Sequence, residues 1–376
     1  MADASLGPLT LKRWPRRRDD PLLPFDAADR YLLKVLDEDR RGPATLVLND
    51  QCGALWLGAI ESGPAWSAGD DWLSWRATNA NAQDNDRAEI GEAWLWPWQT
   101  PPQAPDQVLV RLPKALSLLD AQLAWLATCL PTGTPVWLAG MDKHLPTQLV
   151  PMMQRWFGNG RAGLGWKKAR VFSAEAPGEP PEPEADRQPV PARVAVPERG
   201  WQLHTGPGVF GRRHLDIGAR FLLDHLPLGV DGAVADLGCG NGVLGLSLAA
   251  DNPAARVTFC DVSSLAVQSA RANVADHDRQ PERHDFHLGN GLEGVDKHFE
   301  LILLNPPFHR GHAVDDRVAR GLFRQAARRL VPGGELRVVA NQHLGYQRPL
   351  GKLFPRVETV ARNAKFVIFR CVKGGH

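Results

Sequence analysis

The residues with the clearest chemical potential form a short loop, Asn305-Pro306-Pro307-Phe308, directly after the apolar run at residues 301–304. The Asn305 side-chain oxygen and the Pro306 carbonyl oxygen can accept the two N–H groups of an exocyclic purine amine, which favours a pyramidal nitrogen and stabilises the charge that develops during attack. Pro306 and Pro307 stiffen the loop and lower the entropy lost on positioning a substrate. Phe308 offers a ring on which a flipped-out base can stack. The loop therefore predicts a site for an amine nucleophile, although Asn-Pro-Pro can also simply end a strand.

A second candidate site is the glycine-rich segment at residues 236–242 (DLGCGNG). Glycines between a strand and a helix permit a tight turn and let a ligand approach the backbone closely. Asp236 can hold an ammonium or amide group, and Asp261 can accept both hydroxyls of a ribose. The segment fits S-adenosylmethionine (SAM). It also fits a nicotinamide cofactor, since residues 240–245 satisfy the dinucleotide spacing with an acidic residue at 261. Read alone, Asp261 is equally well a solvated carboxylate at a strand end.

The C-terminal half carries both motifs on alternating strands and helices. Hydrophobic patterning predicts strands at 233–237, 256–260, 285–288, 301–304, 335–340 and 366–371, and helices at 210–226, 243–250, 264–274 and 315–330. This succession predicts a doubly wound, mostly parallel sheet. Ligands of such sheets bind at the carboxyl ends of the strands, so both motifs are expected to face one crevice.

The N-terminal half also alternates, with expected helices at 30–37 and 116–130 and expected strands at 44–48, 107–111 and 135–140. The glycine-rich loop is missing, because Asn49-Asp50-Gln51-Cys52-Gly53 follows the first strand. A linker is expected at 173–199, which holds seven prolines and almost no large apolar residue. The expected domains are therefore 1–172 and 200–376, and twelve of the thirteen tryptophans lie before residue 173.

Composition narrows the class of protein further. No apolar run approaches the ~20 residues of a membrane span. Five cysteines, odd in number and without metal-ligand pairing, favour a reducing, cytoplasmic location and no metal site.

From residue 306 onward, 14 Lys and Arg oppose 4 Asp and Glu, a net charge of +10. Arg317, Arg320 and Arg324 recur at helical spacing, which favours a polyanionic partner such as RNA. A single arginine of this helix is equally typical of a solvated face.

The C-terminal half resembles the class I SAM-dependent methyltransferases, and more narrowly the ribosomal RNA guanine-N2 methyltransferases that have two tandem domains. The resemblance is carried by residues 236–245 (DLGCGNGVLG), 305–309 (NPPFH), 339–346 (VANQHLGY) and 361–373 (ARNAKFVIFRCVK). The last segment is most similar to the large-subunit members. In the N-terminal half, residues 108–114 and 139–145 look similar to the family more loosely.

The resemblance implies an α/β fold of two tandem Rossmann-like domains, the first without a cofactor loop and serving to grip or orient RNA. It implies transfer of a methyl group from SAM to the N2 atom of a specific guanine in large-subunit (23S) rRNA. We expect a monomeric, cytoplasmic enzyme whose substrate is protein-free or assembling rRNA. Carried over residue by residue, the resemblance names three groups of site residues. The cofactor residues are Asp236, Gly238, Gly240, Asp261 and Asn290. The catalytic residues are Asn305, Pro306 and Phe308, and the substrate-binding residues are Pro307, His309, Arg317, Arg320 and Arg324. Asn290 stands between two glycines and can equally be a turn residue.

Four alternatives remain open from the sequence. Small-subunit rRNA guanine-N2 methyltransferases share the motifs, and enzymes that methylate adenine N6 or a protein glutamine share Asn-Pro-Pro followed by an aromatic residue. A nicotinamide-dependent oxidoreductase leaves the 305–308 loop unexplained. A non-catalytic RNA-binding protein fits the N-terminal half better than the C-terminal half.

Overall fold

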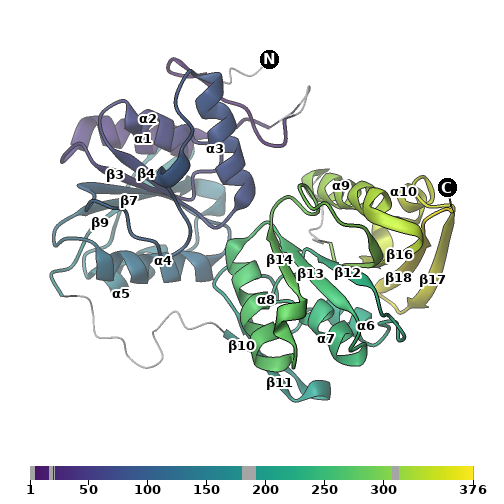
Figure 1. The fold of residues 1–376 in the computed structure, drawn as a ribbon. Coiled ribbons are helices and arrows are strands. Elements are labelled where there is room, and N and C mark those ends of the chain that lie inside the picture. The colour runs from purple at the N-terminus through teal and green to yellow at the C-terminus, as the bar shows by residue number, and fades with distance from the viewer. Residues whose placement is uncertain (1–4, 17–19, 21, 180–191, 307–312, 376) are drawn as a thin grey trace. The chain divides into compact units, whose positions relative to one another are not determined.

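The computed structural model describes residues 5–16, 20, 22–179, 192–306 and 313–375. The chain divides into two compact units, Met1–Val190 and Pro191–His376, which are coloured purple to teal and teal to yellow in Figure 1. Each unit is built around its own seven-stranded sheet. The expected fold of two tandem α/β domains is therefore confirmed.

The sheet of the second unit has its first strand, β12, in the interior, and the strand order is β14-β13-β12-β15-β16-β18-β17. The five strands from β14 to β16 run parallel, while β18 is antiparallel to both of its neighbours. The strands are β12 (Ala233–Leu237), β13 (Arg256–Asp261), β14 (Asp285–Leu288), β15 (Phe299–Leu304), β16 (Leu330–Asn341), β17 (Arg356–Arg362) and β18 (Phe366–Val372).

Helices cover both faces of this sheet because its central strands are apolar on both sides. Along β12, Val234 belongs to one hydrophobic cluster, while Ala235 and Leu237 belong to the other. The first cluster includes buried residues of α6 (Ile217–Leu223), α7 (Val243–Asp251) and α8 (Ser264–His277). The second includes residues of α9 (Ala313–Arg329) and α10 (Gln347–Gly351). The helices thus hold the carboxyl ends of β12, β13 and β15 in fixed positions.

Several expected elements of this unit have different bounds in the structure. The helix expected at 210–226 is only α6, because Asp216 caps it at Ile217 and the preceding glycines hold turns. The strand expected at 335–340 is the end of β16, which continues back through the Pro332-Gly333-Gly334 segment. The antiparallel strand β17 was not expected.

The first unit repeats the topology of the second, with the strand order β5-β4-β3-β6-β7-β9-β8. Its strands are β3 (Thr45–Leu48), β4 (Ala65–Ala68), β5 (Trp94–Leu95), β6 (Gln107–Arg111), β7 (Pro135–Met141), β8 (Arg161–Trp166) and β9 (Ala169–Glu175). Its helices are α1 (Ala27–Asp39), α2 (Ala54–Ile60), α3 (Trp72–Asp84), α4 (Leu116–Cys129) and α5 (Leu149–Phe157). A two-stranded sheet of β1 (Ser5–Leu6) and β2 (Leu9–Thr10) precedes them.

The range expected as a linker, 173–199, carries strand structure at both ends. Strand β9 runs to Glu175, where it pairs with Pro135 of β7. Strand β10 (Ala192–Val196) forms an antiparallel hairpin with β11 (Trp201–Thr205). Proline-rich composition concealed these pairings, because the apolar alternation of β10 consists of only Val194 and Val196 beside a segment rich in proline.

Two further findings concern the described residues only. None of their helices combines the length and the apolar character needed to cross a membrane. None of their His, Cys, Asp and Glu side chains form a group of three or more that could hold a metal ion.

Candidate active site

The loop after β12 is a cradle whose shape depends on glycine. Gly238, Gly240 and Gly242 have φ values of +75°, +55° and +82°, a region that other residues enter only with strain. A Cβ added to Gly242 would meet Ala270 Cβ at 2.9 Å, so this glycine is required for packing against α8. By contrast, a Cβ on Gly238 or Gly240 would meet no heavy atom of the described chain within 4 Å. The loop therefore turns an open backbone surface away from the core.

Asp236 lies in β12 just before this cradle and is 1% exposed. Its Oδ2 accepts a hydrogen bond from the Gly245 backbone N–H at 2.9 Å. Its Oδ1 is buried and has no hydrogen-bond partner in the described part of the chain. Burial raises the pKa of Asp236 to about 7, and the nearby charge of Asp261 adds to the rise. A buried acceptor of this kind fits a ligand that brings an ammonium or amide donor.

Asp261 ties the end of β13 to the glycine cradle. Its Oδ2 accepts from the Gly240 backbone N–H at 2.9 Å, and its Oδ1 accepts from the Ser263 N–H at 3.0 Å. A carboxylate at the end of this strand is chemically suited to accept ribose hydroxyls. The Asp261 carbonyl also accepts from the Gly289 N–H at 2.9 Å, which joins the loop after β14 to the same edge.

Asn290 lies in that loop, half-buried. Its Nδ2 donates to Glu293 Oε2 at 3.1 Å, and its backbone carbonyl accepts from Gln325 Nε2 of α9 at 3.1 Å. The loops after β12, β13 and β14 thus meet at one edge of the sheet, where Asp236, Gly238, Gly240, Asp261 and Asn290 had been expected to line a cofactor site.

Asn305 follows β15 at this same edge. Leu304 pairs with Leu237 of β12, so Asn305 stands level with Gly238 across two parallel strands. Its Nδ2 donates to Asp216 Oδ2 at 3.2 Å. Its Oδ1 is buried and meets no donor among the residues that the structure describes. The arrangement leaves one amide oxygen available to a substrate N–H group.

The other residues expected around Asn305 are only partly visible. Pro306 is described and buried. Pro307, Phe308 and His309 lie outside the described residues. Asp216 was missed as a site residue because it fell inside an expected helix. An acidic residue directly before the helix-forming segment Ile217–Leu223 is an N-cap signal that could have revealed Asp216.

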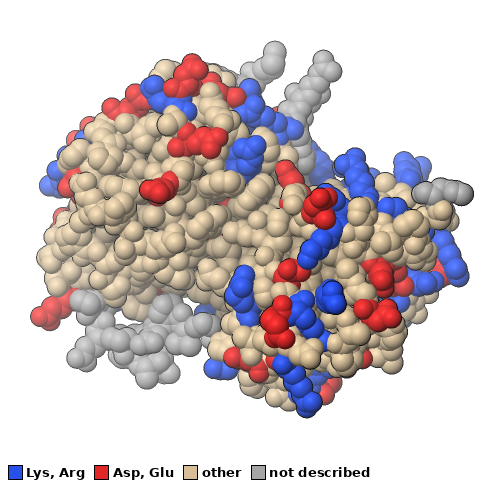
Figure 2. Space-filling model, viewed as in Figure 1, with Lys and Arg blue, Asp and Glu red and all other residues tan. Residues whose placement is uncertain are grey.

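The expected basic helix is α9. Its buried face includes Ala319, Phe323 and Ala326, whereas Arg320 and Arg324 are exposed and Arg317 is half-buried. Arg320 pairs with Asp316 at 2.8 Å, so part of its charge is compensated. Figure 2 shows blue Lys and Arg side chains over the region that α9 and α10 occupy in Figure 1, with acidic side chains between them.

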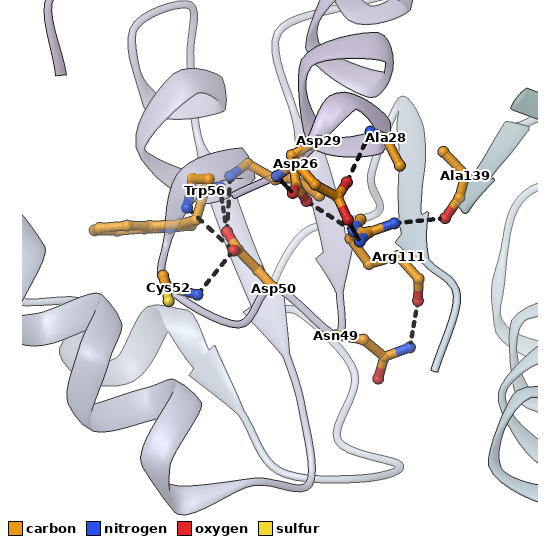
Figure 3. Close-up of polar contacts among 11 residues, drawn as sticks. Asp26, Ala28, Asp29, Asn49, Asp50, Cys52, Trp56, Arg111 and Ala139 are labelled. Carbon is orange, nitrogen blue, oxygen red and sulfur yellow. Dashed lines mark hydrogen bonds and ion pairs between the residues drawn. The ribbon is translucent and has the colours of Figure 1, made fainter. Parts of the chain in front are cut away.

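The corresponding loop of the first unit is filled by the chain itself (Figure 3). The Asp50 carboxylate is buried beneath the start of α2. It accepts from the backbone N–H groups of Leu55, Trp56, Ala54 and Cys52 at 2.8, 2.9, 3.0 and 3.4 Å. The donors at the helix start, which can serve a ligand in an open loop, are therefore satisfied internally.

The strand-end position of Asn305 is also altered in the first unit. Leu48 of β3 pairs with Val110 of β6, so Arg111 takes the place that Asn305 has in the second unit. Arg111 pairs with Asp26 at 2.9 Å and Asp29 at 2.8 Å, and it donates to the Ala139 carbonyl at 3.0 Å, as Figure 3 shows. A guanidinium bound on several sides leaves no acceptor for a substrate amine.

A doubly wound sheet with an open glycine cradle, and with an amide oxygen that meets no donor among the described residues, is suited to hold a cofactor against an amine acceptor. Residues 200–370 match the family model described as the methyltransferase small domain, and residues 2–178 match the RLMG N-terminal domain. The second unit is accordingly a methyltransferase domain.

Two relatives extend the match to the whole chain. The chain is 53% identical over 378 aligned residues to the ribosomal RNA large subunit methyltransferase G of Alcanivorax borkumensis, covering 97% of this chain and 95% of that protein. Its fold is also similar to that of a T. thermophilus 16S rRNA N2 methyltransferase solved with AdoMet and guanosine, with a TM-score of 0.75, 24% identity and coverage of 97% and 95%. This chain belongs to the ribosomal RNA large subunit methyltransferase G family.

Proposed function

We propose that this enzyme transfers a methyl group from SAM to the exocyclic N2 of a specific guanine in large-subunit (23S) rRNA. The observation that carries the proposal is the buried Asn305 Oδ1, which has no partner in the described chain and lies at the sheet edge beside the glycine cradle. Such an oxygen can accept a hydrogen bond from the N–H of an exocyclic amine. The name of the 53% identical relative supports rRNA of the large subunit as the substrate.

The residues of the cradle fit SAM. The open backbone at Gly238 and Gly240 leaves room for a ligand, and Asp236 Oδ1 offers a buried acceptor to its ammonium group. Asp261, which is bound to the same loop through the Gly240 N–H, supplies the carboxylate for its ribose hydroxyls. Asn290, in the loop after β14, is proposed to contact its adenine. When bound, SAM supplies an electrophilic methyl group on a sulfonium. Direct methyl transfer requires no metal.

The protein's own contribution is to orient the amine. Asn305 Oδ1 and the Pro306 carbonyl accept the two N–H groups of guanine N2, which turns the nitrogen lone pair toward the cofactor side of the crevice. Phe308 and Pro307 pack against the base, and His309 contacts the substrate. No strong base is needed before attack, because the amine becomes acidic only after it is methylated and its proton can then pass to water.

Basic side chains of the second unit are proposed to bind the phosphates of the RNA. Arg317, Arg320 and Arg324 of α9 contact phosphates, and the +10 segment from residue 306 provides sequence-independent attraction. The first unit, with its filled loop, orients RNA and performs no chemistry.

We further propose that the enzyme is monomeric and cytoplasmic and that it acts on protein-free or assembling subunit rRNA. Its two domains are proposed to be separated within residues 173–199.

The test is methyl transfer from tritiated SAM to protein-free 23S rRNA, followed by mass analysis of the modified nucleoside. We expect N2-methylguanosine with the wild type. In Asn305→Ala, loss of one positioned hydrogen-bond acceptor is expected to lower kcat by about 100-fold, with SAM affinity unchanged. Full activity in the variant would contradict the proposed role of Asn305. Incorporation only into 16S rRNA, into adenine or into a protein glutamine would redirect the assignment of the substrate.

A further inference from the structure

Asp216 connects the start of α6 to Asn305, the residue proposed to hold the substrate amine. It is the N-cap of α6, and its Oδ2 accepts from the Ala219 backbone N–H at 2.9 Å. The same Oδ2 accepts from Asn305 Nδ2 at 3.2 Å, across 89 positions of sequence. The carboxylate is thus fixed by a helix start and in turn contacts the amide expected to hold the substrate.

The chemistry of the pair determines which way the amide faces. An ionised carboxylate only accepts hydrogen bonds, so the amide of Asn305 must turn Nδ2 toward Asp216. Oδ1 then faces the opposite way, where it is buried and has no partner among the described residues. With the amide reversed, two oxygens would face each other, and a substrate N–H would meet the Nδ2 donor of Asn305. Only the first orientation accepts an amine.

The first unit contains the same pairing with a different donor. Asp26 is the N-cap of α1, where its side chain accepts from the Ala28 N–H at 2.8 Å. Its Oδ2 accepts from Arg111 Nη2 at 2.9 Å (Figure 3). Arg111 closes β6 as Asn305 closes β15. The fold therefore brings a helix N-cap carboxylate to the end of the fourth parallel strand in both units, and the residue that it holds differs.

The segment that ends in Asp216 is fixed at its other end too. Thr205 Oγ1 accepts from Asn241 Nδ2 of the glycine loop at 3.0 Å. The Gly206 N–H donates to Ser269 Oγ of α8 at 3.0 Å. The segment thus runs from the cofactor loop to the strand end that carries Asn305, and its two anchors limit how far Asp216 can move.

We infer that Asp216 is a positioning residue that fixes the Asn305 amide with its oxygen toward the substrate amine. This inference rests on the proposed function. Asp216 acts through Asn305 and needs no contact with substrate or cofactor. Its carboxylate converts an amide that could present either a donor or an acceptor into one that presents an acceptor only.

Three substitutions separate this role from helix capping. Asp216→Ser keeps a good N-cap, but its hydroxyl is one atom shorter and cannot reach Asn305 while it caps α6. Asp216→Asn keeps a side-chain oxygen that can accept from both Ala219 and Asn305. Asp216→Ala loses both contacts. The measurements are kcat and KM with 23S rRNA, SAM affinity by calorimetry, and Tm.

We expect Asp216→Ser to lower kcat by about 10- to 100-fold while KM for SAM and Tm stay close to the wild-type values, because the amide then samples both orientations. Asp216→Asn should restore kcat to within a few-fold of wild type. In an Asn305→Ala background, Asp216→Ser should cause no further loss. A wild-type kcat in Asp216→Ser, an equal loss in Asp216→Asn, or a further loss in the double variant would each overturn the inference.

Different results would contradict the proposed function and the positioning role of Asp216. If wild-type enzyme transfers no methyl group to guanine N2, the proposed function fails. If wild-type enzyme is active and Asp216→Ser is equally active, only the positioning role fails. Side-chain amide resonances of ¹⁵N-labelled protein provide a readout that does not depend on substrate. The Asn305 Nδ2 signal should shift or broaden in Asp216→Ser and remain close to its wild-type position in Asp216→Asn, and an unchanged signal in Asp216→Ser would contradict the inference.

Discussion

Two buried oxygens of the second unit, Asp236 Oδ1 and Asn305 Oδ1, accept no hydrogen bond within the described part of the chain. An unsatisfied buried polar atom costs about 1–3 kcal/mol of folding free energy. Asp236 lies in β12, which leads into the glycine cradle, and Asn305 follows the neighbouring strand β15. Under the proposed function, N–H donors of the cofactor and of the substrate bind to these two oxygens and offset this cost.

The raised pKa of Asp236 gives a pH-dependent prediction. Because its pKa rises from 3.8 to about 7 on folding, the folded state binds this proton more tightly than the unfolded state. The group's contribution to stability is fully present below about pH 4 and is lost as the pH rises through about 7. Asp236→Asn, which cannot ionise, should therefore stabilise the ligand-free protein at pH 8, by at most about 4 kcal/mol.

Urea unfolding at pH 5 and pH 8 measures this effect. The stabilisation by Asp236→Asn should be less than half as large at pH 5, because the folded wild-type carboxyl is then mostly protonated, whereas the carboxyl of the unfolded chain, with its pKa of 3.8, is still mostly ionised. SAM affinity, measured by calorimetry at pH 8, should fall in the variant because the ammonium group loses its charged partner. A stability difference of the same size at both pH values would contradict the raised pKa.

At the scale of elements, one topology supports an open loop in one unit and a filled loop in the other. The loops after β3 and β12 both end at a helix N-cap glycine with positive φ, Gly53 at +78° and Gly242 at +82°. Asn49 and Gly238, four residues earlier, also share a positive φ of +61° and +75°. What differs is Asp50, whose carboxylate occupies the helix start in the first unit.

The open loop predicts that alanine substitutions at two glycines of similar backbone geometry have different effects on SAM affinity. Gly240 and Gly229 have φ values of +55° and +75°, and a Cβ on either would meet no described atom within 4 Å. Alanine should therefore cost each site a similar strain, about 1 kcal/mol. Only Gly240→Ala places its methyl group in the cradle, so only this variant should weaken SAM binding, by 10-fold or more.

Calorimetric titration with SAM and urea unfolding of both variants provide the comparison. Gly229→Ala is the matched control because Gly229 lies in the loop between α6 and β12. Equal SAM affinity in the two variants would show that the surface at Gly240 does not face the cofactor.

For the whole molecule, the central feature is that two units with separate hydrophobic cores share one chain. The buried clusters of the first unit contain residues up to Ala176, and those of the second begin at Val194. No cluster of the described residues spans both units. Folding energy is therefore gained within each unit, and only the second unit has a loop open to a cofactor.

This separation predicts two unfolding transitions in calorimetry. SAM should raise the midpoint of one transition only, since a ligand stabilises the unit that binds it by RT ln(1 + [L]/Kd). At a concentration of 100 Kd the gain is about 2.7 kcal/mol. Asp236→Asn should abolish the shift and leave the other transition in place. A single cooperative transition that SAM moves as a whole would contradict independent units.

The sequence by itself determined the local features of this protein. Strands β12, β14 and β6 have the bounds that hydrophobic patterning predicted, because short apolar runs between turn residues leave few alternatives. The glycine loop and the Asn305 motif could be read because neighbouring residues make up each of them. The proline-rich boundary hid the β10–β11 hairpin, since its pairing depends on residues on both sides of a turn.

Only the tertiary structure decided which of these features work together. Asp216 and Asn305 are 89 positions apart, and no spacing rule connects them. They meet because α6 packs against the sheet and brings its N-cap to the end of β15. The altered strand end of the first unit is another such case, since Arg111 meets Asp26 and Asp29 only when α1 lies beside β6. Contacts of this kind depend on how elements pack, and a linear pattern carries no record of that packing.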